Sequence, residues 1–219
     1  ITFAHGCDYE GYDTEGFAEA VEKAKNADEI LFFGGETRDW TGENHNKTHI
    51  TIPDVQLMLL RELKKLGKKI IFVMTGRPLA ALEMDQLSDA VLCVWHAGHQ
   101  AGNGICDVLF GDTAPCGKLP FTFPRYIGQI PVYYAQYSTG RPKKDYQRYI
   151  DSPAEPLYPF GYGLSYAKIR YSDIHVTKDA IKATDTLHAS VKVHNESDVG
   201  TYEVVQVYFR DVVSTYATP

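Results

Sequence analysis

Three carboxylate residues follow closely on one short apolar segment of the sequence. The segment Glu29–Gly35 (EILFFGG) is typical of a buried parallel strand, and Glu36, Asp39 and Glu43 come directly after it. Functional side chains of α/β proteins collect where parallel strands end, and a carboxylate there is placed to donate or accept a proton. By position alone, all three residues are candidates for such a role.

Composition excludes several other classes of function. The 219-residue chain has a net charge of −6 and no basic patch, so we expect no nucleic-acid partner. No apolar run is long enough to predict a membrane span. The four cysteines, Cys7, Cys93, Cys106 and Cys116, lack CxxC spacing, so no metal site is expected, and no cofactor is predicted. Cys93 and Cys106 lie in apolar stretches and are expected to be buried.

Strand and helix patterns alternate through the first two thirds of the chain. Apolar runs predict strands, and segments with apolar residues at helical spacing predict helices between them. The helix over 15–26 is expected to be capped by Thr14, and the second helix to have Pro53 at its first position and to end at Gly67. The predicted strands are 29–35, 69–75 and 90–95, and the other predicted helices are 79–87 and 102–110. This order predicts an α/β fold with a mostly parallel sheet sandwiched by helices.

The pattern changes after Gly111. A proline- and tyrosine-rich stretch leads to a region of alternating apolar and polar residues from about Tyr166, with a further strand expected at Val204–Phe209. These strands are too few to close two sheets, so they predict a truncated β-sandwich. We therefore expect an α/β domain over 1–165 and a partial β-sandwich domain over 166–219.

Several segments together carry a family resemblance. They are GETRDWTGENHNKTHITIP (35–53), WHAGHQAGNGICDVLFGDTAPCGKLPFTFP from Trp95, IGQIPVYY, TGRP (139–142) and PLYPFGYGLSY (156–166). In this order they resemble the C-terminal half of family 3 glycoside hydrolases, especially bacterial periplasmic β-glucosidases. The resemblance implies a layout of an N-terminal (β/α)8 barrel with an aspartate nucleophile, an α/β sandwich domain with the acid/base glutamate, and a fibronectin type III-like domain.

The resemblance also separates the three carboxylates. The family motif S-G-E-x-x-S-R falls on Thr41–Lys47, which implies that Glu43 is the general acid/base and leaves Glu36 as the runner-up. Lys47 stands where arginine is common, which leaves a positive charge near Glu43. Trp40 and His45 lie close to Glu43 in the sequence, so Trp40, His45 and Lys47 are the candidate substrate-binding residues; the alternative for Trp40 is that it packs the loop onto the domain. In Trp95–Gly102, Gln100 and Ala101 replace a common glutamate and glycine, and this segment is interpreted as a structural strand-to-helix turn.

The expected function is that of a fragment of a retaining exo-acting β-glucosidase, periplasmic or secreted, acting on β-linked oligosaccharides or glycosides. The barrel and the usual first strand and helix of the sandwich domain are expected to be missing before Ile1. Because the nucleophile domain is missing, the isolated chain should be inactive. The alternatives are a β-xylosidase of the same family and a non-catalytic carbohydrate-binding or interaction module.

Overall fold

The computed structural model describes residues 1–77, 80–135, 149–210 and 213. The start of the predicted helix at 79 and the TGRP segment at 139–142 lie outside these residues. The chain forms two compact units. The first consists mainly of Ile1–Ala101 and Leu119–Gly161, and the second of Gly102–Lys118 and Tyr162–Phe209.

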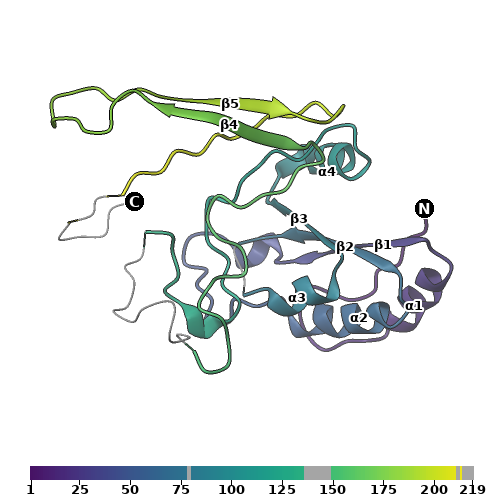
Figure 1. Cartoon of the computed structure of the whole chain (residues 1–219). Coiled ribbons are helices and arrows are strands. Elements are labelled where there is room, and N and C mark those ends of the chain that lie inside the picture. The colour runs from purple at the N-terminus through teal and green to yellow at the C-terminus, as the bar shows by residue number, and fades with distance from the viewer. Residues whose placement is uncertain (78–79, 136–148, 211–212, 214–219) are drawn as a thin grey trace. The chain divides into compact units, whose positions relative to one another are not determined.

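A parallel three-stranded sheet forms the centre of the first unit. Its strands are β1 (Glu29–Gly35), β2 (Lys69–Thr75) and β3 (Ala90–Trp95), in the order β1-β2-β3. The register places Gly35 beside Thr75, so β1 and β2 end together. Helices α1 (Phe17–Lys25), α2 (Asp54–Lys64) and α3 (Leu82–Leu87) lie along one face of the sheet (Figure 1). The predicted parallel sheet with helices is confirmed, and all three strands have the predicted bounds.

The core of this unit lies between the sheet and the three helices. The rings of Phe32 and Phe72 stack with their centroids 5.0 Å apart, and Phe72 is fully buried. From the helices, Leu60 and Met84 pack into the same cluster. Burial of these side chains stabilises the layer by about 1.5–3 kcal/mol each, which holds the ends of the strands in place.

The ends of the helices differ from the predictions. Thr14 does not cap α1, because its carbonyl accepts the Phe17 amide in a turn and Gly16 takes the N-cap position. Pro53 is the N-cap of α2 rather than its first residue, with its carbonyl accepting the Gln56 amide. Helix α3 starts at Leu82, and the preceding Ala80 amide donates to the carbonyl of Ile50, 2.7 Å away.

The second unit contains α4 (Ala101–Leu109) and an antiparallel pair, β4 (Ile169–Val176) and β5 (Ala189–Asn195). The pair confirms the predicted change to β-structure after the α/β region. The strand predicted at Val204–Phe209 is wrong: this segment is irregular, and Phe209 is 81% exposed, so no buried face orders it. Cys106 is exposed rather than buried, because no residue of α4 is buried.

The segment after β3 returns to the sheet of the first unit. Phe123 forms an isolated antiparallel bridge with Tyr158, and its ring lies 6.2 Å from that of Trp95. Between β3 and α4, a short 3-10 turn over Gly98–Gln100 confirms the predicted structural turn. Within the described residues, none of the helices has the length and apolarity needed to cross a membrane.

Candidate active site

Glu36 is the first residue after β1, and the neighbouring strand encloses it. Its amide donates to the Thr75 carbonyl, and its own carbonyl accepts the Thr75 hydroxyl at 2.9 Å. Gly76, the residue after Thr75, has φ +98°, and a Cβ built there would lie 2.7 Å from Cβ of Glu36. A glycine is therefore needed at position 76, and Glu36 is only 1% exposed.

Two cations neutralise this buried carboxylate. Arg77 Nε donates to Glu36 Oε2 at 2.7 Å, and Lys47 Nζ lies 2.9 Å from Oε1. Oε1 has this ion pair but no well-aligned hydrogen bond. Burial by itself would raise the pKa of Glu36, but the contacts with Lys47 and Arg77 outweigh it and hold the pKa below its ordinary value. Glu36 is thus ionised at neutral pH.

Arg77 also binds the backbone on both sides of Glu43. Its NH1 donates to the His45 carbonyl at 3.2 Å, and its NH2 donates to the Trp40 carbonyl. The Arg77 amide adds a longer bond to Glu36 Oε2, at 3.3 Å. We call this set of contacts from Arg77 to Glu36, Trp40 and His45 the Arg77 clamp.

Glu43 lies in the turn that the Arg77 clamp encloses. The His45 amide donates to the Gly42 carbonyl at 3.2 Å, which closes a four-residue turn. Asn44 takes a left-handed conformation with φ +66°, which suits an asparagine. Glu43 is solvent-exposed in this turn, whereas Glu36 is sealed. Of the two candidates, only Glu43 can reach an external ligand.

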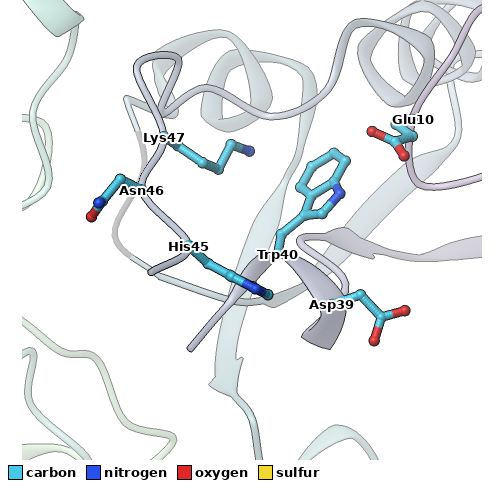
Figure 2. A pocket seen from close by; sticks show the side chains of 6 residues that line it. All are labelled: Glu10, Asp39, Trp40, His45, Asn46 and Lys47. Carbon is cyan, nitrogen blue, oxygen red and sulfur yellow. The ribbon is translucent and has the colours of Figure 1, made fainter. Parts of the chain in front are cut away.

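An open hollow of about 390 Å³ adjoins this turn. Its lining comprises Glu10, Asp39, Trp40, His45, Asn46 and Lys47. Figure 2 shows the Lys47 amine directed at the indole of Trp40, and Nζ lies 4.0 Å from the ring centroid. Glu10 and Asp39 lie on the other side of the indole (Figure 2). The hollow therefore combines an aromatic ring with polar groups of both charges.

The structure brings together the three residues predicted to bind substrate, Trp40, His45 and Lys47. Lys47 was expected near Glu43 but pairs with Glu36 instead. Sequence analysis did not anticipate Glu10 in the lining or Arg77 as the central contact. The position of Arg77, two residues after β2 and at the edge of the sheet where β1 also ends, was the available signal.

Comparison with known families identifies the family to which the chain belongs. Residues 2–166 match the model of the glycosyl hydrolase family 3 C-terminal domain. The chain belongs to this family.

The curated relatives of this family 3 chain include enzymes named as β-glucosidases and enzymes named as β-xylosidases. It is 44% identical over 208 residues to the "Periplasmic beta-glucosidase" of Salmonella typhimurium, covering 92% of this chain and 27% of the relative. It is 37% identical over 214 residues to a "Beta-xylosidase" of Formosa agariphila, covering 96% of this chain and 29% of the relative. The chain thus spans less than a third of the length of these relatives.

Solved structures agree with this family assignment. The β-glucosidase of Listeria innocua in complex with gluconolactone superposes with a TM-score of 0.88 at 34% identity, covering 96% of this chain and 30% of that one. The family 3 β-glucosidase of Bifidobacterium adolescentis superposes with a TM-score of 0.70 at 30% identity, covering 89% of this chain and 30% of that one. The family 3 chain is therefore part of a group of glycoside hydrolases.

Proposed function

We propose that this chain supplies the general acid/base of a retaining exo-acting β-glucosidase, with Glu43 as proton donor and then proton acceptor. A (β/α)8 barrel domain outside this sequence supplies the aspartate nucleophile. The two domains together hydrolyse terminal β-linked sugars from oligosaccharides or glycosides. By analogy with the Salmonella relative, named a periplasmic enzyme, the complete protein works in the periplasm or outside the cell.

The observation that carries this proposal is the contrast between the two glutamates. A general acid must reach the glycosidic oxygen and must be able to hold a proton near the working pH. Glu36 is buried, and its two cations favour the ionised form. Glu43 is exposed in an ordered turn beside a hollow that contains an indole. The geometry therefore supports Glu43 in the acid/base role and Glu36 in a structural one.

The hollow supports the assignment of Trp40 to the leaving-group side of the substrate. An aromatic face packs against the C–H groups of a sugar ring, and Lys47 holds the Trp40 indole in place from one side. His45 lines the same hollow and presents ring nitrogens for hydrogen bonding. In a retaining enzyme, the partner carboxylate stands about 5–5.5 Å from the acid/base, so the nucleophile must approach the Glu43 turn.

The test is Glu43→Gln in the complete enzyme that includes this chain. Hydrolysis of an alkyl β-glucoside, whose leaving group needs protonation, should fall about 10²–10⁴-fold. A dinitrophenyl β-glucoside should still form the glycosyl-enzyme, because its leaving group departs without a proton. Added azide should then restore turnover and yield the β-glucosyl azide, because azide needs no general base.

Asp39→Asn is the matched control, since Asp39 lines the same hollow and its side chain is 79% exposed. The hydrolysis rates of this variant should depend on the leaving group in the same way as those of the wild-type enzyme. Full activity of Glu43→Gln on the alkyl glucoside would disprove the acid/base role of Glu43. If Glu36→Gln instead lost activity on this substrate and Glu43→Gln did not, the acid/base role would belong to Glu36.

Two other functions are distinguished by simpler measurements. A carbohydrate-binding module would bind cellobiose, glucose or xylose as the isolated 219-residue chain, whereas our proposal expects neither binding nor turnover without the barrel. The Formosa relative motivates a β-xylosidase alternative, and the ratio of kcat/KM for the aryl β-glucoside and the aryl β-xyloside decides it.

A further inference from the structure

Arg77 is bonded on three sides to the same short segment. Its guanidinium contacts the carboxylate of Glu36 and the carbonyls of Trp40 and His45, which precede and follow Glu43. Its side chain is 27% exposed, and the residue lies two positions after the end of β2. The turn of Glu43 is thereby joined to the sheet by a residue that is distant from it in sequence.

The acceptors of Arg77 are themselves held in place. Glu36 is bound through its backbone to Thr75 and through Oε1 to Lys47. Lys47 in turn lies against the Trp40 ring. The segment 37–47 is therefore joined to Glu36 through both Lys47 and Arg77. Among the described residues, Arg77 alone bonds to the carbonyls of Trp40 and His45.

From this geometry we infer that Arg77 is a positioning residue for Glu43. The bonds from its guanidinium go to the Glu36 carboxylate and to the carbonyls of Trp40 and His45, so it acts on Glu43 through the backbone of the turn. Its role is to fix the backbone of the turn so that the Glu43 carboxyl is presented at one place. This inference rests on the function proposed above for Glu43.

An arginine is required for this role. Its planar guanidinium donates in three fixed directions at once, whereas a lysine ammonium at the end of a flexible chain cannot reproduce that fork. Arg77→Lys thus keeps the positive charge beside Glu36 and removes the bonds to the two carbonyls. Because a displacement of about 1 Å in a catalytic group can cost about 100-fold in rate, the effect on proton transfer should be large.

The first measurement tests the clamp without reference to catalysis. Hydrogen exchange is followed in the 219-residue chain carrying Arg77→Lys, with Arg61→Lys as the control. Arg61 makes an exposed ion pair with Glu83, 2.6 Å away, and contacts nothing in the Glu43 turn. We expect amides within 38–47 to exchange about tenfold faster in Arg77→Lys only, with β2 still protected. Unchanged exchange in 38–47 would overturn the inference.

If Arg77→Lys loses protection in β2 as well, Glu36→Gln serves as the second variant. It weakens one end of the clamp and leaves the donors to Trp40 and His45 in place. Faster exchange confined to 37–47 supports the clamp, and unchanged exchange there overturns it.

The second measurement tests positioning in the complete enzyme. For Arg77→Lys, kcat/KM should fall more steeply as the leaving group becomes more basic, about 100-fold for an alkyl glucoside and little for the dinitrophenyl glucoside. A merely destabilised enzyme would lose the same factor with every substrate, and that result would overturn the inference. If Glu43→Gln itself keeps full activity, the proposed function fails, while the exchange result still decides whether the clamp exists.

Discussion

At the scale of single residues, the arrangement around Glu36 shows how two nearby carboxylates acquire different environments. Glu36 leaves β1 pointing into its own unit, where burial would be costly without the charges of Lys47 and Arg77. Glu43 is seven residues further on, after a 3-10 turn over Arg38–Trp40, and is exposed. Environment, rather than residue type, separates the buried carboxylate of Glu36 from the proposed acid Glu43.

The lowered pKa of Glu36 predicts a pH-dependent stability. Its ion pairs contribute fully above the ordinary glutamate pKa of about 4.3, and this contribution is lost as the pH falls through the lower pKa of the folded state. Glu36→Gln should lower the free energy of unfolding at pH 7 by about 1–3 kcal/mol. Thermal unfolding measured from pH 3 to pH 7 should show that the difference in stability between the variant and the wild type becomes smaller as the pH falls.

Glu19→Gln is the control for that measurement. Glu19 also has a lowered pKa, from its hydrogen bond with Lys23, but its side chain is 59% exposed and solvent screens the pair. Its replacement should have little effect at any pH. A Glu36→Gln variant with a constant difference from wild type across the range would contradict the linkage argument.

Gly76 gives a second prediction at this scale. A Cβ at this position would lie 2.7 Å from Cβ of Glu36, on a backbone with φ +98°. Gly76→Ala should therefore destabilise the chain by about 1–3 kcal/mol, which chemical denaturation would measure. Gly102→Ala in α4 is the matched control, because a Cβ added there would meet no other atom within 4 Å and alanine favours a helix. Equal stability of the two variants would contradict the proposed packing of Gly76.

At the scale of elements, α2 anchors the end of β1 through Gln56. Its amide oxygen accepts the Gly35 amide at 2.7 Å, and its amide nitrogen donates to the carbonyls of Gly35 and Tyr9, each at 2.9 Å. Gln56 is 3% exposed, so its two bonds to Gly35 form away from water. The helix thereby fixes the point from which Glu36 and the site segment depart.

Gln56→Leu should show what this anchor contributes. Leucine keeps much of the volume but leaves buried backbone groups of Gly35 unpaired, at a cost of about 1–3 kcal/mol. Urea unfolding would measure this loss, with Gln86→Leu on the exposed side of α3 as the control. A loss no larger than in the control would show that Gln56 is not an anchor.

At the scale of the whole molecule, several large apolar side chains are exposed to solvent. Within the first unit, Phe33 of β1 is 61% exposed and Leu31 is 39% exposed, side chains that strands normally bury. In the second unit, Val207 is 84% exposed. Exposed apolar groups of this kind mark surfaces that bind other protein segments.

The isolated 219-residue chain should accordingly bind a hydrophobic dye and self-associate. Light scattering should show association that grows with concentration, and Phe33→Lys should reduce both signals, because a charge on an edge strand opposes pairing. Ala167→Lys, at a position outside the parallel sheet, is the comparison. Dye binding and scattering that do not change in Phe33→Lys would contradict this interpretation of the sheet surface.

The sequence by itself determined the elements and the family. Short apolar runs such as Glu29–Gly35 predicted the strands to the residue, because parallel strands are rich in apolar residues and these runs end at glycine or polar residues. Helix ends were predicted less well, as Thr14 and Pro53 show, because caps depend on competing local hydrogen bonds. The order of the motifs carried the family resemblance, which the comparison confirmed.

Only the tertiary structure decided the arrangement of charges. Arg77 and Glu36 are 41 residues apart, and they meet because β1 and β2 pair in parallel with Gly35 beside Thr75. No local pattern encodes that register or the choice of Lys47 for Glu36 rather than Glu43. Ion pairing depends on distance and burial in space, and both arise only when the strands and the segment after β1 have come together.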